Sequence, residues 1–188
     1  MDDRKKENKW LIEAHPILIL SDVPEFKYEH TALDLVPIGW RQLVLELCEK
    51  LEAWATSVGV NAREMRFSQL TIFKGQLVAE VDTDKFDDGC RELIESYCER
   101  SLLICPACGR STHYLAEVDP KHCYYLCEQC AERARASGAA TRPLTEEDVP
   151  YYTYYAYNGD TNEEKAITTK PTHHDAQFRS QWGGKTPS

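Results

Sequence analysis

Two cysteine pairs constrain the fold of this sequence more than any other feature. Cys105 and Cys108 form one C-x2-C pair, and Cys127 and Cys130 form a second after eighteen intervening residues. This spacing is typical of four-cysteine structural zinc sites. Two cysteines three positions apart can place both thiolates on one metal ion, and Gly109 lets the backbone turn away after the first pair. Four thiolates close the tetrahedral shell of Zn²⁺, so we predict one structural zinc ion with no open coordination position.

Other side chains near the two pairs leave an alternative ligand set open. Cys123, His113 and His122 lie close enough in sequence for one of them to replace a cysteine. Two intact pairs favour the all-cysteine set. A thioredoxin-like redox role would require a pair between a strand and a helix of a βαβ unit, and neither pair has that setting.

Length and charge narrow the classes of function. The chain has 188 residues and a formal net charge of −9, which suits one principal domain with appendages. The negative charge argues against general affinity for phosphate backbones and favours partners with basic surfaces. The charged start and the absence of a run of ~20 apolar residues predict neither a secretory signal nor a membrane span. Since the other four cysteines show no regular pairing, we expect a reduced protein in the cytoplasm.

The apolar pattern predicts an α+β chain in four parts. A helix–hairpin–helix core carries a treble-hook or zinc-ribbon-like four-cysteine module and is followed by a partly disordered tail. The predicted parts are an N-terminal arm over 1–36, the α+β core over 37–103, the zinc module over 104–140, and a tyrosine-rich segment with a flexible tail over 141–188.

Periodicity predicts the main elements within these parts. Apolar residues at three- and four-residue steps indicate a helix from Trp40 that stops at Gly59. Lys74-Gly75 is typical of a hairpin turn within 62–82. The remaining predictions are a strand over Pro16–Leu20, a helix from 82–84 to Arg100 with Phe86, Cys90, Leu93, Ile94 and Tyr97 on its apolar face, and a short helix over Glu128–Ala136.

Acidic residues dominate the stretch 80–99. They form either a solvated helix face or a negative surface for a basic groove, such as one that normally holds nucleic acid. On the second interpretation, the candidate partner-binding residues are Asp84, Asp88, Glu92 and Glu95. Carboxylates could also bind a catalytic cation, so a metal-dependent nuclease using Asp82, Asp84, Asp87 or Asp88 is a third hypothesis. Because no recognisable catalytic motif accompanies them, we predict that the chain is not an enzyme.

Two further segments bear on binding. The tyrosine run contains Tyr152, Tyr154 and Tyr155, whose rings suit either an edge strand packed on the core or an interface. Within 104–140, four basic and four acidic residues cancel, and four thiolates on one Zn²⁺ leave the module about two charges negative. Phosphate recognition needs a basic patch, so a zinc-ribbon nucleic-acid-binding regulator is the alternative and not the leading hypothesis.

The order of these motifs resembles a family of uncharacterised phage and prophage accessory proteins with a C-terminal zinc-ribbon-like module. The resemblance covers about 37–130 and rests on Pro37-Ile-Gly-Trp40, Glu99-Arg100-Ser101, Cys105-x-x-Cys108-Gly and the second cysteine pair. The family typically carries a Lys-Phe-Gly-type motif where this chain has Arg66-Phe-Ser. The resemblance implies a phage origin and assigns no residue a role. Small acidic phage proteins often bind host proteins. We therefore predict a zinc-stabilised inhibitor of a host protein, such as a CRISPR or other nucleic-acid-handling defence complex.

Overall fold

The described residues form helices and small antiparallel sheets, an α+β fold as predicted. The computed structural model describes residues 3–20, 26–83, 85–119, 122–145, 148, 152–158 and 163–169. Contacts divide the chain into two units, Met1–Arg142 and Pro143–Ser188. The α-helices are α1 (Asp3–Ala14), α2 (Arg41–Val58), α3 (Asp88–Arg100) and α4 (Glu128–Ala136). The strands are β1 (Arg66–Phe73), β2 (Gln76–Asp82), β3 (Tyr114–Asp119), β4 (His122–Leu126), β5 (Ala140–Pro143), β6 (Tyr152–Asn158) and β7 (Glu163–Thr169).

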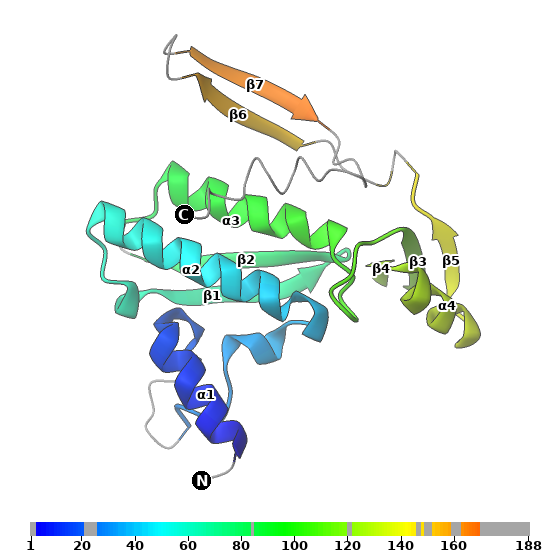
Figure 1. The fold of residues 1–188 in the computed structure, drawn as a ribbon, viewed down its shortest axis with the longest axis horizontal. Helices are drawn as coiled ribbons and strands as arrows, with labels where there is room; N and C mark the ends of the chain where they lie inside the picture. The colour runs from blue at the N-terminus through cyan, green and yellow to red at the C-terminus, as the bar shows by residue number, and fades with distance from the viewer. Residues whose placement is uncertain are drawn as a thin grey trace, which may run out of the picture. The chain divides into compact units, whose positions relative to one another are not determined.

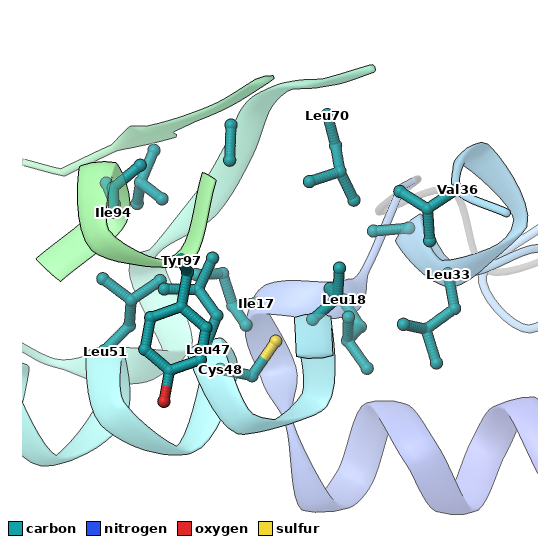
Figure 2. Close-up of a cluster of buried hydrophobic side chains, with 14 of the residues drawn as sticks. Ile17, Leu18, Leu33, Val36, Leu47, Cys48, Leu51, Leu70, Ile94 and Tyr97 are labelled. Carbon is teal, nitrogen blue, oxygen red and sulfur yellow. The ribbon is translucent and has the colours of Figure 1, made fainter. Parts of the chain in front are cut away.

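Helices α2 and α3 and the β1–β2 hairpin enclose the main core. Figure 1 shows the two helices running alongside the hairpin. In Figure 2, Leu47 and Leu51 of α2 meet Ile94 and Tyr97 from α3, and all four side chains are buried. The predicted stop of α2 is confirmed, because Gly59 has φ +71° and its N–H closes the last turn. The apolar face that the sequence predicted for α2 is buried. Its contact with α3 sets the position of α3.

The β1–β2 hairpin turns at the predicted pair. Lys74 and Gly75 have φ of +49° and +77°, as a two-residue hairpin turn with both central residues left-handed requires. The register places Phe73 opposite Gln76 and Leu70 opposite Ala79, with a bulge between Phe67 and Gln69. The turn therefore fixes which side chains of the hairpin face the core.

The segment after α3 covers the outer edge of β2. The backbone N–H of Leu77 donates to the Ser101 hydroxyl at 2.9 Å, and that hydroxyl donates to the Cys98 carbonyl. The N–H of Ala79 hydrogen-bonds the Cys98 sulfur. Ser101 is fully buried. Two N–H groups that would otherwise form an open sheet edge are thus satisfied by side chains at the end of α3.

Helix α3 begins later than predicted. Strand β2 extends to Asp82, which pairs with Arg66, so the chain is still extended where the sequence predicted helix. Asp87 caps the helix instead, because its carboxylate accepts the Cys90 N–H at 2.8 Å. Phe86 precedes the helix and is 45 % exposed, so its assignment to the buried face was wrong.

The N-terminal arm also differs from its prediction. Pro16–Leu18 is a short 3-10 helix and not a strand, because Pro16 sits at its first position and its carbonyl accepts the Ile19 N–H. Among the described residues of the arm, the extended pairing is one bridge between Ile19 and Thr31. Ile17 and Leu18 are buried in the main core. The arm is therefore part of the core. The other 3-10 helices are Ala32–Leu35, Ile38–Trp40, Ala62–Glu64 and Ser101–Leu103.

The second unit contains a β-hairpin. Strand β6 pairs antiparallel with β7, with Tyr152 opposite Thr169 and Asn158 opposite Glu163. Strand β7 lies in a stretch predicted to lack regular structure, so that prediction was wrong for 163–169. The sequence there is polar, and its strand signal is the β-branched run Ile167-Thr168-Thr169. The prediction for 170–188 falls outside the described residues. None of the described helices has the length and apolar content of a membrane span.

The edge contact of Ser101 yields a stability prediction. Ser101→Ala leaves the buried Leu77 N–H without an acceptor, and an unsatisfied buried donor costs about 1–3 kcal/mol. The free energy of unfolding from urea titration is the measurement. Ser57→Ala is the matched control, because Ser57 is an exposed hydroxyl that bonds only a carbonyl of its own helix. The control should change stability by less than about 0.5 kcal/mol. Equal effects of the two changes would contradict the edge-capping role.

Candidate metal centre

The structure brings the four predicted cysteines together. Cys105 and Cys108 follow the 3-10 helix after α3, whereas Cys127 caps α4 and Cys130 lies in its first turn. The β3–β4 hairpin spans the distance between the two pairs. All four sulfur atoms lie within 4.8 Å of one another, and this is the group of potential ligands found in the described part of the chain. The turn that carries Cys105 and Cys108, which we call the knuckle, forms a compact module with the β3–β4 hairpin and α4. This module is of the zinc-ribbon-like kind that the sequence predicted.

The sulfur separations fit a tetrahedral metal. The Cys108 and Cys127 Sγ atoms lie 3.5 Å apart, and those of Cys108 and Cys130 lie 3.6 Å apart. Four sulfurs at ~2.3 Å from one ion would be separated by ~3.8 Å, whereas a disulfide would require ~2.05 Å. The spacing is therefore that of thiolates around a shared structural metal ion such as zinc.

The first cysteine pair is held by its own backbone. The N–H groups of Cys108 and Gly109 both donate to the Cys105 carbonyl, at 3.3 and 2.8 Å, and the Cys105 N–H donates to the Arg110 carbonyl at 2.7 Å. Gly109 has φ +77°, a left-handed conformation that suits glycine, as the sequence predicted for this position. The knuckle therefore presents both thiolates to the same point.

Local hydrogen bonds prepare these thiols for a metal. Burial is the largest effect on the Cys108 pKa and raises it. Nevertheless, the backbone N–H of Arg110 and the neighbouring thiols together lower this pKa to about 7. Burial raises the pKa of Cys105, against the backbone N–H groups of Cys127 and Ala107. A metal must displace the remaining protons, since each ligand is a thiolate.

An arginine contacts the cluster from α4. The Arg133 guanidinium donates to the Cys130 sulfur at 2.9 Å. Four thiolates around a divalent ion carry about two excess negative charges, so a cation here offsets part of them. Sequence reasoning missed this residue. The available signal was its spacing, because residues three apart on a helix lie on one face.

The first pair is also fastened to the main core. The Gly39 N–H donates to the Pro106 carbonyl at 2.8 Å, and the buried Trp40 indole donates to the Ile104 carbonyl at 2.7 Å. A Cβ on Gly39 would lie 2.6 Å from the Pro106 oxygen and closer still to that of Cys105, so glycine alone fits. We call this contact the knuckle latch. The sequence predicted a helix at Trp40 but gave no signal for this docking.

The alternative ligands lie apart from the cluster. Neither His113 nor Cys123 belongs to the group of sulfurs within 4.8 Å, and His113 is exposed. Cys123 lies in β4, where its carbonyl would be 2.7 Å from a Cβ on Gly75 of the β1–β2 turn. Cys123 therefore helps to pack the four-cysteine module against the β1–β2 hairpin. His122 is in β4, and its side chain falls outside the described part of the structure.

The aspartates proposed for a nuclease do not converge in the described part of the structure. Asp82 ends β2, Asp87 accepts from Cys90 and from the Trp54 indole at 3.1 Å, and Asp88 pairs with Arg91 at 2.6 Å. Asp84 falls outside the described residues. A cavity of about 270 Å³ touches Asp82, together with Glu64 and Lys85. The Lys85 ammonium is used there in a hydrogen bond to the Val58 carbonyl, at 3.1 Å.

Acidic residues form a stripe along α3. Asp88, Glu92, Glu95 and Glu99 are spaced by four, three and four residues and so share one face. The first three are exposed. Glu92 and Glu95 form no ion pair within the described residues. Burial, and then the nearby Glu95 carboxylate, raise the pKa of Glu99 to about 7. We call these four residues the acidic stripe.

The candidate tyrosines lie in the second unit. Tyr152, Tyr154 and Tyr155 are in β6, where Tyr154 pairs with Ile167 and Tyr155 with Ala166. Their side-chain environment falls outside the described part of the structure. The segment is a strand, as one of the two interpretations required, and its role in binding stays a prediction.

Comparison with known proteins adds no relative. No family model, curated protein or solved structure matches the chain. The function must therefore be inferred from the geometry of the chain itself.

The metal centre predicts a large effect of metal removal. Natively purified protein should carry about one metal ion per chain, and a chelator or Cys105→Ser should destabilise it severely, because structural zinc contributes about 10 kcal/mol in isolated fingers. Elemental analysis and thermal unfolding with and without chelator are the measurements. Cys123→Ser is the control, because Cys123 is a half-buried thiol outside the cluster. A folded, natively purified sample without metal would contradict the centre.

The knuckle latch predicts a second effect. Gly39→Ala should cost about 1–3 kcal/mol or more in unfolding free energy, as overpacking does, and should speed loss of the metal to a chelator. The control is Gly89→Ala in α3, where the nearest atom to the new Cβ would be 3.4 Å away. That change should be neutral or stabilising by up to ~1 kcal/mol. If Gly39→Ala unfolds and releases metal as the parent does, the latch contributes nothing.

Proposed function

We propose that this chain is a zinc-stabilised binding protein that recognises a basic surface on another protein. The acidic stripe of α3 carries this proposal. The exposed carboxylates of Asp88, Glu92 and Glu95 extend over seven residue steps, or ~10 Å of helix. Glu92 and Glu95 have no ion partner in the described part of the chain. A cationic partner would supply one.

Contacts with α2 fix both ends of α3, the helix that carries the acidic stripe. At its start, Asp87 accepts the Trp54 indole N–H of α2, and at its end Arg100 pairs with Glu46 of α2 at 2.9 Å. The opposite face of α3 is buried through Ile94 and Tyr97. A rigid helix loses little conformational entropy on binding, so its charges can be complementary to a partner without local folding.

The stripe also carries internal repulsion. Glu95 helps to raise the pKa of Glu99, which shows that the two carboxylates disfavour each other's charge. Like charges four residues apart destabilise a helix by a few tenths of a kcal/mol. A basic partner would relieve this repulsion and lower the Glu99 pKa, so binding should strengthen from pH 6 to pH 8 as Glu99 ionises.

The metal supports this function by holding the fold. We propose that the ion is Zn²⁺, because it accepts four thiolates in a closed tetrahedral site. Cys105, Cys127 and Cys130 are buried, which suits a structural role. A four-thiolate centre requires reduced cysteines, so we propose the cytoplasm as the compartment.

Nucleic-acid binding is the weaker candidate. The module's arginines are used internally: Arg110 donates to Gln129 at 2.9 Å, Arg133 to Cys130, and Arg135 to Thr141 at 2.6 Å while lying 5.6 Å over the Tyr114 ring. A phosphate-binding surface requires cations that are available to the ligand. In its most specific form, the proposal is a phage protein that inhibits a host nucleic-acid-handling complex, such as a CRISPR effector, by occupying a basic groove.

Charge reversal tests the proposal. A variant with Asp88, Glu92 and Glu95 changed to Lys should lose capture of a protein from a bacterial host lysate, because the stripe would then repel a basic surface. Binding by the parent should weaken between about 0.1 M and about 1 M salt, where the Debye length falls from ~10 Å to ~3 Å. Mass spectrometry of the captured proteins is the measurement.

A control with the same charge change separates the stripe from net charge. Glu7, Glu117 and Glu132 are exposed carboxylates on α1, β3 and α4, and their change to Lys should leave capture intact. Capture by the stripe variant equal to that by the parent would overturn the proposal. If Ala at Tyr152, Tyr154 and Tyr155 alone abolished capture, the tyrosine segment would be the binding surface. Tight binding of DNA or RNA in a mobility shift would favour the nucleic-acid hypothesis.

A further inference from the structure

The four thiols of the metal centre differ sharply in access. Cys105, Cys127 and Cys130 are 0 %, 4 % and 5 % exposed, whereas Cys108 is exposed. We propose that Cys108 is the site at which a hydroperoxide oxidises the centre, and that Cys127 then forms a disulfide with it. The chain would thereby release its zinc ion in response to an oxidant.

Access and hydrogen bonding point to the same thiolate. A thiolate reacts with a peroxide only where the oxidant can reach its sulfur, and the three buried sulfurs are shielded by the surrounding chain. At Cys130, the Arg133 guanidinium donates a hydrogen bond to the sulfur, with an N–S distance of 2.9 Å. A charge-assisted hydrogen bond of this kind lowers the nucleophilicity of a sulfur. In the described residues, no side-chain cation is bonded to Cys108 in the same way.

The oxidation balances with a hydroperoxide as the oxidant. The Cys108 thiolate attacks one oxygen of hydrogen peroxide, the O–O bond breaks, hydroxide leaves, and the sulfur becomes a sulfenic acid. A second thiolate then attacks this sulfur, the S–S bond forms, the S–O bond breaks, and a second hydroxide leaves. Two thiolates thus supply the two electrons that reduce the peroxide. The disulfide has lost the charge that held the metal.

All three other sulfurs of the cluster lie within 4.8 Å of that of Cys108, so hydrogen bonds must distinguish the partner for the second step. The backbone N–H groups of Cys127 and Ala107 donate to the Cys105 sulfur, which disfavours its attack. The Cys127 and Cys130 sulfurs lie 3.5 and 3.6 Å from that of Cys108, so either could close the bond after a small movement. The Arg133 hydrogen bond disfavours attack by Cys130. Cys127 is therefore the thiolate that completes the disulfide.

Loss of this metal would destabilise the main core, because the knuckle latch joins the first cysteine pair to it. Either disulfide partner lies in the second cysteine pair, and the remaining two thiolates are insufficient to hold zinc as a structural ion. The first pair abuts Gly39 and follows directly after Ile104, the acceptor of the Trp40 indole. Oxidation at an exposed sulfur is thereby coupled to a buried contact of α2.

Alkylation of the zinc-loaded full chain tests the accessibility required by the first step, and it needs no mutation of a metal ligand. The Cys123→Ser background removes a half-exposed thiol that lies outside the centre. With iodoacetamide below one equivalent, peptide mass spectrometry should find Cys108 modified before the other three ligands. First modification at Cys105, Cys127 or Cys130 would overturn the proposal.

Hydrogen peroxide tests the second step. Zinc release, followed with a chromogenic chelator, should accompany a Cys108–Cys127 disulfide in non-reduced peptide maps. Arg133→Gln should raise the share of Cys108–Cys130 disulfide about threefold or more, because one charge-assisted hydrogen bond is lost. Arg135→Gln is the matched control, since Arg135 lies on the same helix as Arg133 but bonds Thr141 of β5. It should leave the disulfide ratio unchanged.

Each remaining outcome has a distinct meaning. A Cys105–Cys108 disulfide, or zinc release without any disulfide, would overturn the second step. An unchanged disulfide ratio in Arg133→Gln would overturn the role of the arginine in choosing Cys127. A natively purified sample without metal would overturn the metal centre and this proposal together, whereas loss of partner capture bears only on the acidic stripe.

Discussion

The contact between Gly39 and the first cysteine pair is the constraint on which the rest of the structure depends. A metal at the four sulfurs would hold the two pairs together, whereas this backbone contact joins the first pair to the helical core, with the Trp40 indole bonded to the Ile104 carbonyl beside it. No side chain fits between the two backbones. Metal binding and core packing therefore stabilise one unit, and a ligand mutation should lower the stability of α2 as well as that of the module.

Edge coverage explains why a two-stranded sheet suffices here. An isolated hairpin is marginal in water, and an open edge invites pairing with other chains. The β2 edge is covered by the Ser101 hydroxyl and the Cys98 sulfur, while the turn at Gly75 packs against β4. The first contact comes from the end of α3, just before the cysteine module, and the second comes from β4 within the module. The end of α3 and the module thus contribute to the hairpin's stability from two sides.

The sequence could predict features that depend on local chemistry. The cysteine spacing, the stop at Gly59 and the Lys74-Gly75 turn each follow from a residue's own conformational or metal-binding preference. The start of α3 was misplaced because acidic residues favour helix starts in general, whereas only the pairing of Asp82 with Arg66 shows that the chain is still a strand there. Arg133 and the latch at Gly39 depend on contacts across the fold, which periodicity does not report.

In the proposed function, the metal centre stabilises the fold and the acidic stripe binds the partner. Three cysteines of the metal centre and the apolar face of α3 are buried, so both contribute to holding the fold. The carboxylates of Glu92 and Glu95 form no ion pair in the described part of the chain, and the repulsion between Glu95 and Glu99 opposes folding. A charge pattern that weakens its own helix is explained if it serves an intermolecular contact, since complementarity to a basic surface steers association and repays the local cost only in the complex. Under the proposed function, a basic partner would supply the opposite charge that Glu92 and Glu95 lack in the described part of the chain.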